Sequence, residues 1–529
     1  MKTNVTCWHL RWLVGSLFAF ILVPAATAAQ SQSWPMFGQN VANTASTFNE
    51  DVSTKNIGKL APHWAATLGG DISARAAVVN GVVYVPDWGG NLWAINSSNG
   101  KTVWSHQLSD YGLAAGTVSR TSPAVVDGVV YLGTQYNSSG PTGWLLAINA
   151  ATGSLLWKVQ PDTSNPFPVI TASPTVVNGR VFVGMTSNEE FVAAASFYPC
   201  CSARGSVVAL KATTGEVLWQ TFTAPTGYSG ANVWGSNPVV DVARGSVYVG
   251  TGNNYHFPAT YNNCLNGGGT PAACLDPADY ADAIVALDVA TGAVKWATRL
   301  MTWSLPSVYE DGVDFWNVGC VVPPYTNCPT PNTGPDFDFG SAPNEITYQG
   351  ANGPKTIIGA GQKSGIYYAL DPDTGAVLWQ TQVGPGSTLG GIEWGSASDG
   401  KRIYVAIANL YGIPYAAGSA GSWAALDPAT GAILWRKADP NGAIDLGPLA
   451  VANGIVYAPS MAGAPGAPSM LALDAGTGAQ LWSYAAGSSV IAGASIVNGT
   501  VFWGAGYTHL PFPGFTGSNK LFSFTVGGK

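Results

Sequence analysis

A short phrase ending in tryptophan recurs along the chain and constrains its fold more than any other feature of the sequence. The phrase usually reads apolar–Ala–apolar–Asp or Asn, then a turn that in most copies contains Thr-Gly, then a short strand closed by Trp. Seven complete copies end at Trp104, Trp157, Trp219, Trp296, Trp379, Trp435 and Trp482. Tandem repeats that each carry several short strands are typical of β-propeller blades, so each copy predicts one blade.

A second recurring phrase, strand–Asn/Asp-Gly–strand, lies upstream of most copies. It occurs, for example, at residues 77–85, 124–132 and 495–503. Asn-Gly and Asp-Gly supply the positive φ angles that tight hairpin turns need. Together the two phrases predict four short antiparallel strands per repeat, and no long stretch of the sequence has helical periodicity.

The eighth blade is predicted to be divided between the two ends of the chain. The last strand-like stretch, residues 521–526, is not followed by a Thr-Gly turn and a Trp. The segment around Trp64, near the start of the chain, supplies the missing strand and tryptophan. Pairing the two terminal strands would close a ring and remove two exposed strand edges. The sequence therefore predicts an all-β fold: an eight-bladed β-propeller with four antiparallel strands per blade, closed by its N- and C-terminal strands.

The repeated tryptophans are interpreted as structural, because a large planar side chain at one fixed place in each blade fills the gap between neighbouring sheets. Three segments are insertions relative to the repeat: residues 186–206, 254–282 and 299–345. Insertions of this kind gather on one face of a propeller, where binding usually occurs. We therefore expect the functional site on the face that carries these segments.

Residues 1–29 are typical of a signal peptide. Basic residues precede an apolar run from Trp12 to Val23, which is shorter than a membrane span, and small residues follow at 25–29. We expect cleavage after Ala29, a mature propeller over residues 30–529, a secreted or periplasmic location, and no membrane span in the mature chain; an uncleaved anchor is the alternative. A net charge of −7, without concentrated Lys and Arg, argues against nucleic-acid binding.

Six cysteines remain after the predicted leader: Cys200, Cys201, Cys264, Cys274, Cys320 and Cys328. An even number in an exported protein favours disulfides. Pairing of sequence neighbours would join Cys200 to Cys201, Cys264 to Cys274 and Cys320 to Cys328, but spacing leaves other pairings open. No Cys-x-x-Cys-His motif occurs, so we expect no covalent c-type haem in this chain.

The tryptophan phrase, the opening SWPMFGQNVANTAST and the following KLAPHWAATLGG resemble the quinoprotein alcohol dehydrogenases that depend on pyrroloquinoline quinone (PQQ). The resemblance covers essentially residues 34–526. The repeat is shared with non-catalytic propellers, notably scaffold lipoproteins of bacterial outer-membrane assembly, so it indicates the fold and not the activity. The cofactor and metal positions between the repeats discriminate between these two classes.

The metal and base positions of the family have counterparts in this chain. As calcium ligands the resemblance implies Glu189 in GMTSNEE, with Glu190 adjacent, and Asn253 in YVGTGNNY. In GPDFDFGSAPN it implies Asp336 as catalytic base and metal ligand. It places Asp338 at the position that adds a metal ligand in lanthanide-using relatives.

Four cofactor-binding positions are also matched. The resemblance implies that Trp234 in ANVWGSNP lies flat against the quinone and that Lys363 in GQKSG contacts the quinone carbonyls. It implies that Arg120 in SRTSPAVVDG binds a carboxylate of PQQ and that Thr171 in ITASPTVVNG lies at a further cofactor contact.

The chain departs from the family pattern in several places. Ser73, with Arg75 nearby, stands where the family has a glutamate, and the adjacent Cys200–Cys201 lie in the third blade's insertion instead of the second blade. The phrase around Asp336 lacks its usual Trp, while a Trp-Asn pair lies upstream at 316–317, so a neighbouring acid is an alternative base. These features, with DFWNVGC and GPDFDFG, are most similar to polyvinyl alcohol dehydrogenases, a branch that acts on secondary alcohols and often carries a cytochrome c domain, which is not expected here.

The resemblance thus implies oxidation of an alcohol, secondary or polymeric, that depends on PQQ and Ca²⁺, with a lanthanide as the alternative cation. Carboxylate and amide oxygens suit such hard cations. Asp336 would accept the hydroxyl proton while a hydride moves to the quinone, and an external acceptor such as cytochrome c would take the electrons. Two alternatives remain: a non-catalytic scaffold that binds partner proteins, and a sugar-binding or hydrolytic propeller with a carboxylate pair across a cleft.

Overall fold

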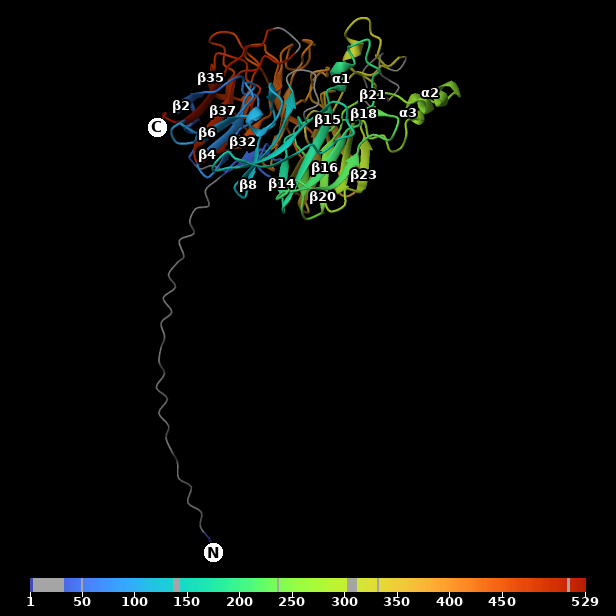
Figure 1. Ribbon diagram of the computed structural model, residues 1–529. Coiled ribbons are helices and arrows are strands. Elements are labelled where there is room, and N and C mark those ends of the chain that lie inside the picture. The colour runs from blue at the N-terminus through green and yellow to red at the C-terminus, as the bar shows by residue number, and fades with distance from the viewer. Residues whose placement is uncertain are drawn as a thin grey trace. The chain divides into compact units, whose positions relative to one another are not determined.

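The computed structural model describes residues 1–2, 33–48, 51–136, 143–235, 237–301, 312–330, 333–510 and 514–529. Ser33–Lys529 forms one compact unit built mainly from short strands (Figure 1). The predicted signal peptide lies, apart from its first two residues, outside the described part of the chain. None of the described helices has the length and apolar character needed to cross a bilayer.

Eight antiparallel sheets confirm the predicted eight-bladed propeller, and the first strands of successive sheets contact each other around most of the ring. Blades one to four comprise β3 (Ala77–Val79), β4 (Val82–Pro86), β5 (Asn91–Asn96) and β6 (Thr102–Gln107); β8 (Ala124–Val126), β9 (Val129–Gly133), β11 (Leu145–Asn149) and β12 (Leu155–Val159); β14 (Thr175–Val177), β15 (Arg180–Ser187), β16 (Ser206–Lys211) and β17 (Val217–Phe222); β19 (Val239–Asp241), β20 (Ser246–Gly250), β22 (Ala283–Asp288) and β23 (Val294–Arg299).

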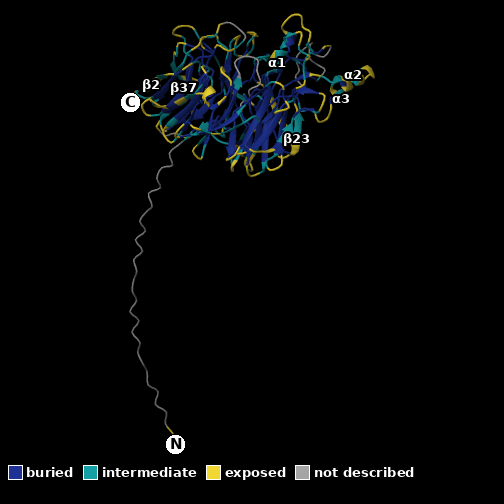
Figure 2. Cartoon of the chain, viewed as in Figure 1, coloured by how far each residue is buried: buried dark blue, intermediate teal, exposed yellow. Residues whose placement is uncertain are grey.

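Blades five to eight comprise β24 (Asn344–Gly350), β25 (Gly353–Gly361), β26 (Ile366–Leu370) and β27 (Val377–Gln382); β28 (Ala397–Ser398), β29 (Ile403–Ile407), β30 (Ser422–Leu426) and β31 (Ile433–Ala438); β32 (Ala450–Ala452), β33 (Ile455–Pro459), β34 (Met470–Asp474) and β35 (Gln480–Tyr484); β36 (Ser495–Val497), β37 (Thr500–Gly504), β38 (Lys520–Val526) and β2 (Leu60–Thr67). Figure 2 shows that the blades are largely buried and that exposed residues gather at the turns and loops.

Short elements complete the fold. They are β1 (Ser46–Thr47), β7 (Thr117–Val118), β10 (Gln135–Tyr136), β13 (Pro168–Val169), β18 (Ser229–Gly230), β21 (Asn254–His256), η1 (Ile57–Lys59), η2 (Leu108–Tyr111), η3 (Val318–Cys320), α1 (Glu189–Val192), α2 (Ala259–Asn266) and α3 (Pro271–Cys274).

The ring closes in blade eight as the sequence predicts. β2, near the start of the described unit, runs antiparallel to β38 at the end of the chain, from Leu60 opposite Val526 to Thr67 opposite Lys520. Because β2 is the outer strand of this blade and β38 its neighbour, neither terminal strand leaves an unpaired inner edge.

The tryptophan of each blade joins that blade to the next one. Every indole Nε1 donates to a backbone carbonyl of the following blade, as in Trp379 to Pro428 at 3.1 Å and, across the closure, Trp482 to Leu60 at 2.9 Å. The other six donations run from Trp104 to Ala150, Trp157 to Ala212, Trp219 to Val289, Trp296 to Pro372, Trp435 to Ala475 and Trp64 to Ser97. The repeated tryptophan is therefore a contact between blades, and its spacing along the chain sets the spacing of the blades.

We expect Gly431→Ala to destabilise the protein by about 2–3 kcal/mol. Gly431 has φ +73°, and a Cβ at this position would come within 2.4 Å of the Trp379 ring, so left-handed strain and overpacking add. Gly442→Ala is a matched control, because Gly442 has φ +71° and no atom within 4 Å of its Cβ position. The control should lose only about 1 kcal/mol in urea unfolding. Equal losses for both variants would contradict the packing role given to the tryptophan.

Residues 33–48 run along the inner strands of the ring and close its centre. Their backbone bonds to successive blades through Trp34 and Val78, Pro35 and Val125, Val41 and Val240, Ala42 and Glu345, and Thr44 and Ser398. β1 then pairs in parallel with β32. The buried guanidinium of Arg75 donates to the carbonyls of Phe37, Pro448 and Leu449, which fixes this segment against blade seven. The centre of the ring therefore has a floor made of the N-terminal segment.

Candidate active site

All predicted site residues lie at one face of the propeller, in the segments between strands. The second strand of a blade and its last strand both end at this face, because consecutive strands are antiparallel. Glu189, Asn253 and Lys363 follow the second strands β15, β20 and β25. The others precede first strands: Arg120 before β8, Thr171 before β14, Trp234 before β19, and Asp336 and Asp338 before β24. The three inserted segments emerge at the same face, as expected from the sequence.

Lys363 is the centre of a buried cluster formed by blades four and five. Its Nζ lies 2.9 Å from Oδ1 of Asp336 and 3.3 Å from Oδ2 of Asp338. The Trp234 indole donates to Oδ2 of Asp338 at 2.7 Å, and the backbone N–H of Asn253 donates to its Oδ1 at 2.6 Å. The structure thus brings together five of the residues that the sequence nominated.

Close backbone packing positions these acids. A Cβ on Gly252 would come within 2.9 Å of the Asp338 carboxylate. Position 252 therefore requires glycine if the carboxylate is to lie against the backbone before Asn253. Asp336 has φ +62°, a conformation held by Asp314, which accepts the backbone N–H groups of Asp336 and Phe337 at 3.0 and 2.7 Å.

Aromatic rings and cations lie beside the cluster. The Lys363 ammonium lies 5.0 Å from the Trp234 ring centroid, and the Arg120 guanidinium lies 5.9 Å from the same ring. Arg120 is also 4.6 Å from the ring of Trp394, which meets Trp234 edge to face at 5.4 Å. Thr171 donates its hydroxyl hydrogen to the carbonyl of Trp234 at 2.9 Å, which fixes the backbone that carries the indole.

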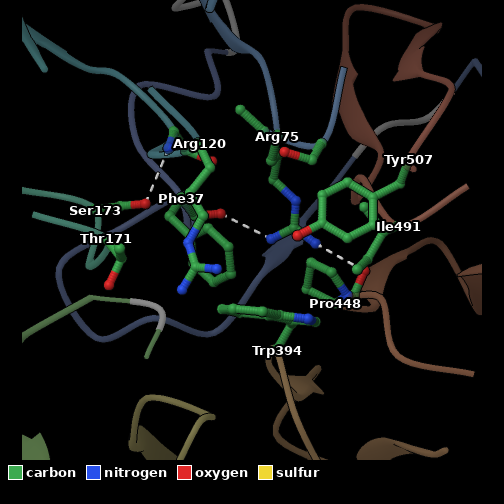
Figure 3. A pocket seen from close by; sticks show the side chains of 12 residues that line it. Phe37, Arg75, Arg120, Thr171, Ser173, Trp394, Pro448, Ile491 and Tyr507 are labelled. Atoms are coloured by element: carbon green, nitrogen blue, oxygen red, sulfur yellow. Dashed lines mark hydrogen bonds between the residues drawn. The ribbon is translucent and has the colours of Figure 1, made fainter. Parts of the chain in front are cut away.

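A pocket opens next to this group, above the floor made by the N-terminal segment (Figure 3). Arg120, Trp394 and Tyr507 line it, together with Phe37 from the floor and Arg75, which bonds to the floor. Its remaining lining residues are Ser73, Ala74, Ser122, Thr171, Ser173, Pro448 and Ile491. The Arg120 Nε is buried and has no hydrogen-bond partner among the described residues. A basic, hydroxyl-lined pocket with aromatic walls suits a planar ligand that carries carboxylates.

The charges of the cluster depend on each other. Burial raises the pKa of Asp336 well above its ordinary value, and Lys363 opposes this shift. Burial alone would lower the pKa of Lys363, but Asp336 and Asp338 outweigh it, so the pKa of Lys363 is raised well above its ordinary value. The lysine therefore stays charged and favours the ionised form of Asp336.

Further acids surround the cluster. Burial raises the pKa values of Glu190, Asp314 and Glu393 to about 7 each, and it raises the pKa of Asp282 well above its ordinary value. One carboxylate oxygen of Glu393 and both oxygens of Asp282 are buried without a hydrogen-bond partner among the described residues. With Asp336 and Asp338 these acids outnumber the cations Lys363 and Arg120, so an additional cation would favour the ionised form of acids whose pKa burial raises.

The structure separates the two glutamates at the start of α1. Glu189, which the resemblance implied as a calcium ligand, is fully buried and bonds to residues 198–203. Glu190 instead faces the cluster: it accepts the hydroxyl hydrogen of Tyr255 at 3.1 Å and interacts electrostatically with Lys363, Asp338 and Arg120. Among the described residues, no three His, Cys, Asp or Glu side chains are already arranged as ligands of one metal ion.

Several site residues were not singled out by sequence reasoning. Asp314 belongs to the DFWN phrase next to the Trp-Asn pair, and Glu393–Trp394 interrupts a glycine-rich loop between β27 and β28. The only sequence signal for these residues was their place on a loop outside the repeat. The Trp-Asn pair itself braces the site, because the Trp316 carbonyl accepts from the side-chain amide of Asn253 at 2.6 Å.

The cysteines pair with their sequence neighbours. The structure contains the disulfides Cys200–Cys201, Cys264–Cys274 and Cys320–Cys328, which selects one of the pairings that spacing left open. All three lie in the inserted segments on the face of the site, where each joins residues close together in sequence.

These features define a class: an eight-bladed propeller with a basic, aromatic pocket beside a buried Lys–Asp–Asp cluster. The family described as outer membrane protein assembly factor BamB matches residues 61–298 and 362–508. The polyvinylalcohol dehydrogenase of Sphingopyxis sp. (strain 113P3) is 31% identical, over 90% of this chain and 73% of the relative, and that of a Pseudomonas species is 30% identical, over 96% and 79%. The chain therefore belongs to the quinoprotein alcohol dehydrogenase family, in the branch of the polyvinyl alcohol dehydrogenases.

A solved structure shows the same fold. The quinohemoprotein alcohol dehydrogenase of Pseudomonas putida HK5 superposes with a TM-score of 0.70, covers 94% of this chain and 81% of its own, and is 18% identical. At this identity the likeness concerns the propeller and not the chemistry.

Proposed function

We propose that the protein oxidises an alcohol with PQQ as cofactor and Ca²⁺, or alternatively a lanthanide, as the bound cation. The observation that carries this proposal is the buried contact of Lys363 with both Asp336 and Asp338, with the Lys363 ammonium over the Trp234 ring. A scaffold propeller has no use for two acids and a lysine held out of water, since burying charges is costly unless a function requires it.

The pocket residues fit PQQ. Trp234 and Trp394 offer aromatic faces. Arg120, whose buried Nε has no hydrogen-bond partner within the described part of the chain, offers a cation to a ligand carboxylate. Thr171, a predicted cofactor contact, also lines the pocket. PQQ, when bound, supplies an electrophilic quinone that takes up a hydride from the carbinol carbon.

The acids fit a hard cation, in an arrangement that differs in one position from the sequence prediction. Asp336, Asp338 and Asn253 supply the carboxylate and amide oxygens that Ca²⁺ prefers. Glu190 takes the place in the proposed ligand set that the resemblance gave to Glu189, because the Glu189 carboxylate is committed to residues 198–203. The excess of acids around the cluster supports a site for a divalent or trivalent cation.

In the proposed reaction Asp336 accepts the proton of the alcohol hydroxyl. Lys363 holds its carboxylate in place and favours the ionised form. Asp338 is oriented by the Trp234 indole and the backbone of Asn253, so its oxygens are fixed while the alcohol is positioned. We propose a secondary or polymeric alcohol as substrate, as the names of the polyvinylalcohol dehydrogenase relatives suggest, and an external electron acceptor such as a cytochrome c, in a secreted or periplasmic setting.

Titration of the metal-free protein with PQQ and Ca²⁺ tests the proposal. We expect saturable, Ca²⁺-dependent binding seen by absorbance, followed by dye reduction that depends on a secondary alcohol or on polyvinyl alcohol. A lanthanide in place of Ca²⁺ identifies the preferred cation. Absence of PQQ binding with either cation would overturn the enzyme proposal and favour a non-catalytic scaffold, the alternative suggested by the description of the matching propeller family.

A further inference from the structure

The two adjacent glutamates at the start of α1 hold different parts of the molecule. α1 (Glu189–Val192) is a single turn, in which neighbouring side chains point in different directions. Glu190 is directed to the Lys363 cluster, whereas Glu189 is directed to the loop that carries Cys200–Cys201.

Both oxygens of the Glu189 carboxylate accept hydrogen bonds from that loop. Its Oε1 accepts the hydroxyl hydrogen of Tyr198 at 2.5 Å and the backbone N–H of Ser202 at 2.8 Å. Its Oε2 accepts the N–H of Ser202 at 2.9 Å and that of Ala203 at 2.5 Å. Hydrogen bonds to a buried carboxylate are among the stronger ones in proteins, and every donor here comes from residues 198–203.

The loop is connected onward to the site. The Ala203 carbonyl accepts from the N–H of Gly230, at the start of the segment that leads to Trp234. The N–H of Ala231, next along that segment, donates to the carbonyl of Asn253 at 2.7 Å. Movement of residues 198–203 would therefore be transmitted to the backbone that carries the Trp234 indole and the Asn253 amide.

We propose that Glu189 is a positioning residue that clamps the Cys200–Cys201 loop at the rim of the site, and that it is not a ligand of the cation. By fixing α1 from one side it also sets where Glu190 points on the other. The consequence for turnover depends on the proposed function, whereas the clamp itself does not.

The test compares the reduction rates of the three disulfides in metal-free protein. Samples are treated with a phosphine reductant, trapped with an alkylating reagent over time and analysed by peptide mass spectrometry. In Glu189→Gln we expect Cys200–Cys201 to be reduced about tenfold faster or more, since at least one charge-assisted hydrogen bond to the loop is lost. Cys264–Cys274 and Cys320–Cys328 should keep their wild-type rates and serve as internal controls.

Three further variants make the result specific. Glu216→Gln, an exposed change, should leave all three rates unchanged. Glu190→Gln should leave the disulfide rates unchanged but raise the Ca²⁺ concentration needed for PQQ binding. Tyr198→Phe combined with Glu189→Gln should accelerate reduction less than the product of the single effects, because both changes remove the same contact.

Two results would overturn the clamp. Unchanged reduction in Glu189→Gln together with lost Ca²⁺-dependent PQQ binding would make Glu189 a metal ligand, as the sequence resemblance implied. Equal acceleration of all three disulfides would show a general structural role. Faster reduction of Cys200–Cys201 alone, in a protein that never binds PQQ, would support the clamp while the proposed function fails.

Discussion

Replacing Asp336 by Asn is expected to lower alcohol-dependent dye reduction by about 10²–10⁴-fold, the usual contribution of a general base. The amide cannot accept the hydroxyl proton, but it has nearly the same shape and can still bond to Lys363. PQQ binding should therefore persist with at most a modest loss of affinity, so the effect falls on kcat. Steady-state kinetics with a secondary alcohol, combined with an absorbance titration of PQQ, separates the two quantities.

Two comparisons give this prediction its control. Asp373→Asn removes an exposed carboxylate that pairs with Arg244, and such pairs contribute little, so its kinetics should equal those of the wild type. Asp338→Asn should weaken cation and cofactor binding more than it weakens the chemical step. The assignment would be reversed if Asp338→Asn abolished turnover at saturating PQQ while Asp336→Asn kept it.

Lys363→Met is expected to destabilise the metal-free protein by about 3–5 kcal/mol at neutral pH, the typical result of removing one partner of a buried ion pair. The change leaves Asp336 and Asp338 buried without their shared cation. The loss in the free energy of unfolding is measured by urea denaturation, in which the midpoint should fall while the m-value stays unchanged. Lys355→Met, an exposed lysine on β25, is the matched control and should change stability by less than about 0.5 kcal/mol.

The loss in Lys363→Met should depend on pH with a definite sign. Burial already raises the pKa of Asp336, and removing the lysine removes the opposing effect. A carboxyl whose folded-state pKa is raised stabilises the protein below its unfolded pKa of about 4, and that stability is lost as the pH rises toward the folded-state pKa. The difference between variant and wild type should therefore grow from pH 4 toward neutral pH. A constant difference across this range would contradict a charge-based role and indicate lost packing instead.

The proposed cation gives this variant a second readout. Ca²⁺ should recover part of the stability of Lys363→Met, because it supplies positive charge to the same carboxylates and binds only the folded site. If Ca²⁺ does not restore stability to Lys363→Met, the cation binds elsewhere on the face that carries the inserted segments.

The sequence alone determined the architecture. The tryptophan phrase and the Asn-Gly hairpins are local patterns, and repetition multiplies the signal, so the blade number, the closing pair β2 and β38 and the face of the site could all be predicted. The association of Lys363, Asp336, Asp338 and Trp234 was also predictable, because these residues lie in recognisable phrases next to strands whose order the repeat already fixes.

Only the tertiary structure decided how individual loop side chains are used. Glu189 and Glu190 are neighbours in the sequence, and the resemblance implied Glu189 as the metal ligand. Contacts with residues 198–203 and with Tyr255 assign the two glutamates to different parts of the molecule. The N-terminal segment that floors the pocket and the acids Asp314 and Glu393 also depend on contacts between distant parts of the chain. The physical reason is the same in each case: strand and turn patterns are set by neighbours in sequence, whereas the direction of a buried carboxylate is set by whichever distant donors satisfy it.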